Sequence, residues 1–337
     1  YYIFEALNKK DDNFTVYYRE VNQAAGKFQE SKPLFTTKGD VAALSYVPGS
    51  FLGVNVGSKF DVTFSHDESK ILIQYRNKPE SKNDAKNYDV LGFYVFDTNF
   101  NKLWGKEEKM PHTEKQMNNL AYTVGSDGTV YMLSFLNETK SFEVITITSS
   151  QGLKNKELPV KKGLHFESFE LTETANGNIV AAGYYDNGNE MKIDITGTMR
   201  GSRNVNGLYV FEISKTGALV RDNDYPFSIE LIKKYLSLRQ KDKADDKEAD
   251  GKAGINDLYM RDLYLDKSGN VVIVGEIYYI RNEWQGPQQL PTIHYSDMIV
   301  TKIDSKGKLL WQDKIPKNQS YAAKNSMMGG GGAKGDL

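Results

Sequence analysis

The clearest strand pattern lies in the last third of the sequence. Residues 262–277 read DLYLDKSGNVVIVGEI, and residues 297–311 read DMIVTKIDSKGKLLW. Each stretch holds two apolar or β-branched runs separated by a short turn that contains Gly together with Asp, Asn or Ser. These turn residues supply the positive φ that tight hairpins require. The two stretches therefore predict two hairpins, which together make a unit of four short antiparallel strands.

The same four-strand unit recurs upstream. Complete copies span residues 62–104, 120–153 and 169–220, and a partial copy occupies residues 14–27. The turns of the second hairpins fall near residues 26, 100, 152, 217 and 307. The tightest spacing between these turns is about 50 residues, which lies in the range of propeller blades.

The repeat decides between two all-β architectures. A four-stranded sheet of this kind buries both faces only when copies stack around an axis, as in a β-propeller. The repeat therefore favours a β-propeller of four-stranded antiparallel blades, and a pair of β-sandwiches is the alternative. Residues 1–337 are expected to form a single propeller domain that is incomplete at both ends, because the chain starts in the second half of one unit. The chain contains 21 Tyr and 16 Phe, and aromatic residues are enriched in β-strands.

Composition excludes several classes of function. The 43 basic and 44 acidic residues give a net charge of −1, which argues against a dedicated nucleic-acid binder. No apolar run approaches the roughly 18 residues of a membrane span. The absence of cysteine excludes disulfides, thiol catalysis and thiolate metal sites, and it fits an exported chain. The chain opens on Tyr1 without a signal peptide, so we expect a processed or truncated chain.

Residues 228–254 interrupt the strand pattern and predict a helical, charged insertion. Ser228 can cap a helix that places Ile229, Ile232, Tyr235 and Leu236 on one face. The segment from 233 to 250 is dense in charges of both signs and predicts a solvated linker. The insertion is either a helix packed on the rim of the blade or an arm that docks a partner.

Two further insertions are predicted to be loops. Residues 281–296 contain Trp284 and Tyr295, which could stack on a sugar, anchor a protein partner or pack the loop onto its blade. Residues 186–206 are rich in Asn and Gly. Their oxygen-bearing side chains, Asp186, Asn187, Asn189 and Asp194, do not have the spacing of a calcium loop.

No constellation of residues predicts catalysis. The four histidines (His66, His112, His165 and His294) form no His-x-x-x-His or His-x-His pair, so a metal site has little support. The sequence holds no Gly-x-Ser-x-Gly elbow and no Gly-x-x-x-x-Gly-Lys-Ser/Thr phosphate loop. Gly330, Gly332 and Gly335 match Gly-x-Gly-x-x-Gly, but no strand precedes them. The recurring turn aspartates Asp67, Asp127, Asp266 and Asp304 are explained by hairpin chemistry. We therefore predict no catalytic residue, no cofactor and no metal.

Residues 269–275 and 297–311 resemble bacterial β-propeller repeats of the form GN-strand-G … D-strand-K-hydrophobic-D-x-x-G-x-x-x-W. More narrowly, residues 276–279, 299–303 and 311–317 resemble a group of uncharacterised exported proteins of Bacteroidota, over roughly residues 160–325. An insertion helix like the one predicted at residues 227–243 is a feature of that group. One departure is Val220, which stands where the repeat ending at Trp311 has tryptophan.

One member type of the group is the periplasmic plug subunit that closes the type 9 secretion translocon. The resemblance implies a periplasmic location and a role of that kind, and it transfers no functional residue. The leading hypothesis is a non-catalytic periplasmic protein-interaction module that binds an envelope protein or a secretion-machinery subunit. Its candidate partner-binding residues are Trp284, Tyr295 and Tyr235. The alternative is a glycan-binding or glycan-hydrolysing propeller, and the absence of cysteine disfavours a cytoplasmic scaffold.

Overall fold

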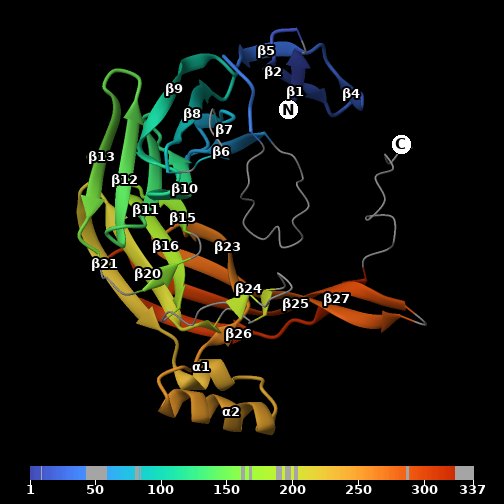
Figure 1. Ribbon diagram of the computed structural model, residues 1–337, viewed down its shortest axis with the longest axis vertical. Helices are drawn as coiled ribbons and strands as arrows, with labels where there is room; N and C mark the ends of the chain where they lie inside the picture. Colours follow the sequence, from blue (N-terminus) through green and yellow to red (C-terminus); the bar gives the residue numbers. More distant parts are fainter. Residues whose placement is uncertain are drawn as a thin grey trace. The chain divides into compact units, whose positions relative to one another are not determined.

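The computed structural model describes most of the 337 residues. The described ranges are 1–8, 10–42, 59–79, 83, 85–160, 164–166, 169–186, 192–193, 199–200, 204–285 and 288–322. They form antiparallel sheets with one helical insertion (Figure 1). The oxygen-bearing side chains of Asn187, Asn189 and Asp194, and the glycine motif at residues 330–335, lie outside these ranges.

Two complete blades follow the predicted order of four consecutive strands. The first is β6 (Phe60–Phe64), β7 (Lys70–Arg76), β8 (Tyr88–Asp97) and β9 (Lys102–Thr113). The second is β10 (Met117–Val124), β11 (Val130–Leu136), β12 (Ser141–Thr148) and β13 (Gly152–Leu158). In both sheets each strand pairs antiparallel with the next strand along the chain.

The third blade has a divided first strand. It comprises β14 (His165–Phe166) and β15 (Glu170–Glu173), which both pair with β16 (Ile179–Asp186), followed by β20 (Gly207–Ile213) and β21 (Leu219–Pro226). The fourth comprises β23 (Leu258–Leu265), β24 (Val271–Gln285), β25 (Gln288–Ile303) and β26 (Leu309–Ile315), with β27 (Gln319–Ala322) added beside β25.

The remaining strands are short or belong to the partial copy. At the N-terminus β1 (Tyr2–Asn8), β2 (Asn13–Arg19) and β5 (Lys32–Thr36) form a three-stranded sheet. Two-stranded pairs are β3 (Val21–Asn22) with β4 (Lys27–Phe28), β17 (Lys192–Ile193) with β18 (Met199–Arg200), and β19 (Asn204–Val205) with β22 (Ile255–Asn256). The predicted fold class is confirmed: the chain is all-β, with the four-stranded antiparallel blades of a β-propeller and a helical insertion.

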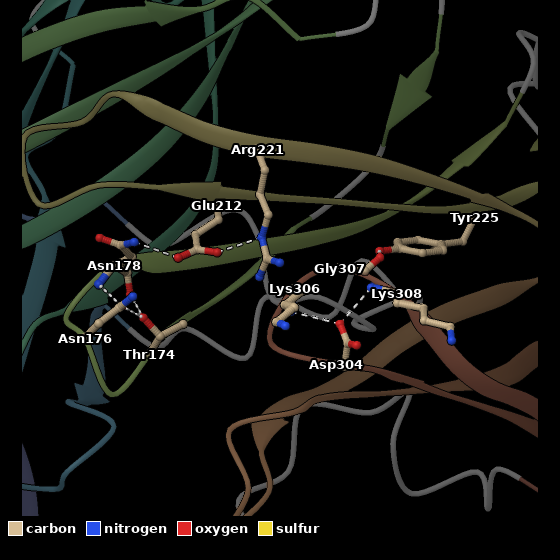
Figure 2. Close-up of polar contacts among 10 residues, drawn as sticks. All are labelled: Thr174, Asn176, Asn178, Glu212, Arg221, Tyr225, Asp304, Lys306, Gly307 and Lys308. Carbon is tan, nitrogen blue, oxygen red and sulfur yellow. Dashed lines mark hydrogen bonds and ion pairs between the residues drawn. The ribbon is translucent and has the colours of Figure 1, made fainter.

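The hairpin turns have the chemistry that the sequence predicts. Glycines take up positive φ in these turns, at Gly128 (81°), Gly177 (80°), Gly217 (73°), Gly269 (75°) and Gly307 (89°). In the turn after β25, Asp304 Oδ1 accepts the backbone N–H groups of Lys306 and Lys308, both at 2.8 Å (Figure 2). Asp67, Asp127 and Asp266 accept backbone N–H groups within their own turns in the same way. The structural role predicted for these aspartates is therefore confirmed.

The chain divides into two compact units. Unit 1 comprises residues 1–162, 168–181 and 211–222, and unit 2 comprises residues 163–167, 182–210 and 223–337. A single propeller domain over residues 1–337 stays a prediction.

Within unit 1, neighbouring sheets pack face to face. Leu72, Phe93 and Val95 of the first blade share a buried cluster with Met132 and Ile145 of the second blade. A second cluster joins residues of the N-terminal sheet to the other face of the first blade. Burial of both faces of the first blade is the packing expected for stacked blades.

The insertion at residues 228–254 contains two helices. In α1 (Ile229–Lys233) the Ser228 hydroxyl accepts the N–H of Leu231, so the predicted cap is confirmed. The predicted solvated linker after it is wrong, because α2 (Leu238–Ala249) occupies that segment. The backbone N–H of Ser237 donates to Gln240 Oε1 at 3.0 Å and starts α2. Lys233 joins the two helices through an ion pair with Asp245.

Candidate functional site: the distal hairpin

The candidate site lies in unit 2, on the far half of the hairpin formed by β24 and β25. We call residues 278–285 and 288–295 the distal hairpin. The loop predicted from the sequence at residues 281–296 is wrong, because paired strands occupy most of this segment. The strands stay paired from Tyr278 opposite Tyr295 to Gln285 opposite Gln288. Figure 1 shows the hairpin running on beyond β26, with β27 along one side.

The strand geometry brings Trp284 and Tyr295 onto one face. Side chains alternate between the two faces of a strand, so Tyr278, Ile280 and Trp284 share a face. Cross-strand pairing adds Ile293 and Tyr295 to the same face, and β27 adds Tyr321, which pairs with Ile293. We call this surface the aromatic face of the distal hairpin.

The two candidate residues differ in exposure. Trp284 is 70% exposed near the tip of the hairpin. Tyr295 is partly buried, with its ring 5.1 Å from that of Tyr278 and 6.2 Å from that of Tyr321. Trp284 and Tyr295 therefore lie at opposite ends of the aromatic face, with the partly exposed Ile280 and Ile293 between them.

A buried carboxylate anchors the base of the face. Glu276 is 7% exposed, and its two oxygens bind Arg261 Nε, at 2.9 Å, and the Lys317 ammonium. Arg261 and Lys317 come from other parts of unit 2, so Glu276 holds three segments together. Because the carboxylate has two cationic partners, its burial is compensated.

The same two cations contact the aromatic rings. The Arg261 guanidinium carbon lies 5.4 Å from the ring centroid of Tyr278 and 5.9 Å from that of Tyr295. Lys317 Nζ lies 5.5 Å from the ring of Tyr295. Burial raises the pKa of Tyr278, and the nearby Tyr295 adds to that rise. These contacts fix Tyr295 from its buried side and leave its outer part on the aromatic face.

The opposite face of the distal hairpin is polar. His294 stacks on Tyr279 with ring centroids 4.8 Å apart, and its Nε2 lies 3.0 Å from Glu283 Oε1. The Arg281 guanidinium lies 4.6 Å from the ring of Tyr279. The hairpin therefore has one mainly apolar face, on which Asn282 and Gln289 also lie, and one face that carries its charged side chains.

Tyr235 lies elsewhere in unit 2, in the turn between α1 and α2. It has a positive φ of 65° and is 56% exposed. Its ring lies 5.2 Å from Lys234 Nζ, and Lys234 forms an ion pair with Asp313. The structure brings Trp284 and Tyr295 onto one face, and it places Tyr235 on a separate element.

In unit 1, two carboxylates form an ion-pair network around Arg76. Asp89 Oδ1 lies 2.5 Å from Arg76 Nε, and Glu114 Oε1 lies 2.6 Å from Arg76 Nη2. Burial raises the pKa of Asp89, and Arg76 opposes that rise. Both carboxylates bind Arg76, and the amide of Asn87 also binds Glu114. A structural role accounts for these charges.

Two further described histidines, His112 and His165, have carboxylate partners. His112 Nε2 lies 3.0 Å from Glu143 Oε2, and His165 Nδ1 lies 3.2 Å from Asp186 Oδ2. Over the part of the chain that the structure describes, no group of three or more His, Cys, Asp or Glu side chains could hold a metal ion. The described helices are also too short and too polar to cross a membrane.

Most of the residues that build and anchor the aromatic face were not predicted from the sequence. Glu276, Arg261 and Lys317 are far apart in the sequence, and only the strand pairing brings them together. The paired strands had one local signal, because Gly286 and Pro287 stand between two segments in which aromatic and branched residues alternate with polar ones. A two-residue turn at that position would have predicted the continued hairpin.

Comparison with known proteins shows no family. No family model matches the sequence, and no curated protein matches it. A solved structure of a protein of unknown function from Bacteroides caccae aligns with 11% identity and a TM-score of 0.26, over 93% of each chain. A protein of unknown function from Dyadobacter fermentans aligns with 11% identity and a TM-score of 0.36, over 94% of each chain.

An exo-β-1,3-galactanase from Phanerochaete chrysosporium also aligns. The identity is 11% and the TM-score is 0.38, over 96% of this chain and 66% of the galactanase. At these identities and TM-scores, none of the activities of these proteins is transferred to this chain.

Proposed function

We propose that this protein is a non-catalytic protein-interaction module whose partner binds the aromatic face of the distal hairpin. The observation that carries the proposal is the exposure of Trp284, at 70%, on a face that also presents Ile280, Ile293 and Tyr321. Exposed aromatic side chains beside aliphatic ones are typical of the centres of protein interfaces. The partner therefore presents an apolar surface that covers the tryptophan.

The way the hairpin is anchored supports this role. The ion pairs of Glu276 and the stacked tyrosines hold the base of the hairpin in one conformation. A preformed surface loses little conformational entropy when a partner binds. Tyr235 contributes a second, separate contact point on the insertion.

The resemblance to exported Bacteroidota proteins motivates a narrower form of the proposal. In that form the protein is periplasmic, its partner is an envelope protein or a subunit of secretion machinery, and it closes the periplasmic side of a type 9 secretion translocon. Fractionation of cells that produce the full-length protein tests the location. Recovery in the cytoplasmic fraction would contradict this narrower form and leave the interaction surface untouched.

Site-specific photocrosslinking tests the interaction surface itself. A photoreactive residue is placed at position 284 and, in a matched control, at position 311, where Trp311 of β26 is 46% exposed outside the aromatic face. We expect a discrete protein adduct from position 284 and none from position 311. A glycan array run in parallel separates the glycan alternative, because glycan binding lost in Trp284→Ala without a protein adduct would overturn the proposal.

A further inference from the structure

The outer edge of β24 in the distal hairpin is free of a neighbouring strand among the described residues. On one side β24 pairs with β25 along the whole hairpin. On the other side its pairing with β23 ends at Leu258 opposite Ile277. Residues 279–285 therefore form an edge strand, which offers unpaired backbone groups to another strand.

The direction of the backbone groups follows from one hydrogen bond. The N–H of Tyr278 donates to the carbonyl oxygen of Asp257 at 2.9 Å, so it points away from β25. Backbone groups alternate between the two sides of an antiparallel strand. Ile280, Asn282 and Trp284 therefore also direct their N–H and C=O groups outward. The register from Tyr278 opposite Tyr295 to Gln285 opposite Gln288 has no shift, so this alternation holds along the whole edge.

This edge carries the charged residues Arg281 and Glu283, but it lacks other common protections against strand pairing. Edge strands of natural proteins commonly carry proline, lysine or a bulge that prevents further pairing. Residues 279–285 read YIRNEWQ and contain neither proline nor lysine, and the bulge in β24 comes before them, between Glu276 and Tyr278. On the other strand of the hairpin, Pro291 pairs with Asn282, so the backbone N and C=O of Pro291 point away from β24. Pro291 has no N–H group, so the far side of β25 lacks a donor at that position.

The edge is complementary to itself in antiparallel register. When two copies pair about a two-fold axis at Asn282, Arg281 of one copy lies opposite Glu283 of the other, and Ile280 lies opposite Trp284. The outward backbone groups of residues 280, 282 and 284 then face one another, as hydrogen-bonded antiparallel pairs require. Opposite charges and apolar side chains in directly opposed positions stabilise strand pairs. Arg281 has no acidic ion-pair partner among the described residues. Glu283 is only partly buried, and one of its carboxylate oxygens lies 3.0 Å from His294 Nε2.

We propose that two copies of this protein associate through antiparallel pairing of their β24 edges, centred on Asn282. The partner is a second copy because residues 280–284 are complementary to the same residues of another copy. In antiparallel pairing, opposite charges lie opposite each other, and so do apolar side chains. Such an isologous interface has closed two-fold symmetry. The proposal goes beyond the interaction module described above, because it uses the strand edge and leaves most of the aromatic face uncovered.

Sedimentation velocity of the whole chain, over a concentration series from about 10 µM to about 1 mM, tests the pairing, since a short edge interface is expected to be weak. Wild type is expected to shift from monomer to dimer across this range. Arg281→Glu places two glutamates opposite each other, and Glu283→Arg places two arginines opposite each other. Each substitution alone is expected to weaken dimerisation at least about tenfold.

A mixture of the two single variants gives the decisive result. One copy then carries two acidic residues and the other two basic residues, so every cross-strand charge pair is complementary again. We expect heterodimers in the mixture, and dimers in the double variant. Restored association also shows that the single variants are folded. Arg239→Glu on α2 controls for net charge and is expected to dimerise like wild type.

A backbone variant tests the strand pairing separately from charge. Asn282→Pro removes an outward N–H and leaves the side facing β25 intact, and it is expected to abolish the dimer. A wild-type protein that stays monomeric up to about 1 mM would overturn the proposal. So would dimers that persist in both charge variants, or a mixture of these variants that stays monomeric.

Discussion

The ammonium of Lys314 on β26 donates a hydrogen bond of 2.8 Å to the carbonyl oxygen of Ile232 in the last turn of α1. A second hydrogen bond, of 3.1 Å, reaches the carbonyl oxygen of Lys234. Lys314 is 2% exposed, and burial lowers its pKa. A cation at a helix C-terminus satisfies carbonyl groups that lack partners within the helix. This contact ties the helical insertion to the fourth blade.

Replacing Lys314 with methionine is expected to loosen the insertion. Two carbonyl oxygens lose their donor, which we expect to cost about 1–3 kcal/mol. Hydrogen exchange of the amides in residues 229–249 is expected to accelerate, while exchange in β24 and β25 changes less. Lys306→Met, at an exposed turn position, is the control and is expected to leave exchange in the insertion unchanged. Equal exchange rates in Lys314→Met and wild type would show that the contact does not hold the insertion.

The equivalent tryptophans of two blades are expected to differ in their contribution to stability. The indole N–H of Trp104 donates to the carbonyl oxygen of Gly128 in the next blade at 3.0 Å, whereas Trp311 is 46% exposed. Trp104→Phe removes the hydrogen bond and is expected to lower the free energy of unfolding by about 1 kcal/mol. Trp311→Phe is expected to change it by less than about 0.5 kcal/mol. Urea unfolding of both variants measures the difference, and equal losses would contradict the inter-blade contact.

A tyrosine ring covers a glycine on the neighbouring strand of the first blade. Tyr75 pairs with Gly92, and a Cβ atom at residue 92 would lie 2.2 Å from carbons of the Tyr75 ring. Gly92→Ala is expected to displace the ring and destabilise unit 1 by about 1–3 kcal/mol. Gly39→Ala has open space around its Cβ position and is the matched control. Thermal unfolding of both variants tests the prediction, and a Gly92→Ala protein as stable as wild type would contradict it.

The turn after β6 predicts a specific pH dependence. Hydrogen bonds to its carboxylate lower the pKa of Asp67 from 3.8 to about 2, and the largest effect comes from the Ser65 hydroxyl. A lowered pKa means that ionised Asp67 stabilises the folded chain above about pH 4, and that this contribution is lost as the pH falls through about 2. Asp67→Asn is expected to be less stable than wild type at pH 5, by less than about 1 kcal/mol because the group is solvent-exposed.

The stability difference between Asp67→Asn and wild type is expected to shrink as the pH approaches 2. Urea unfolding at several pH values follows this change. Glu68→Gln removes the neighbouring exposed carboxylate and controls for net charge. A difference that stays constant between pH 5 and pH 2 would contradict the assignment.

The blades were predictable because their turns depend on single residues. Gly128, Gly177 and Gly217 adopt the positive φ that the sequence pattern requires. The buried strands between them are continuous runs of branched and aromatic residues. Both signals are local, so a single sequence suffices to locate the four-strand units.

The distal hairpin and α2 escaped prediction for physical reasons. In the hairpin, polar residues at 281–283 interrupt the apolar pattern, because these positions face solvent on an extended strand. In α2 only Ala244 is buried, so the helix has no apolar stripe. Its sequence therefore has the pattern of a charged linker. The anchor of Glu276 with Arg261 and Lys317 joins three separate segments, and no local pattern identifies it.

The proposed role of Trp284 is to bind a protein partner on the aromatic face of the distal hairpin. Its most direct test is capture of binding proteins from native membranes with wild type, Trp284→Ala and Trp311→Ala as matched baits. We expect a stable partner that wild type and Trp311→Ala retain equally. Trp284→Ala is expected to recover at least about tenfold less of it, as for an aromatic residue central to an interface. Equal recovery by Trp284→Ala and wild type, or no stable partner with any bait, would contradict it.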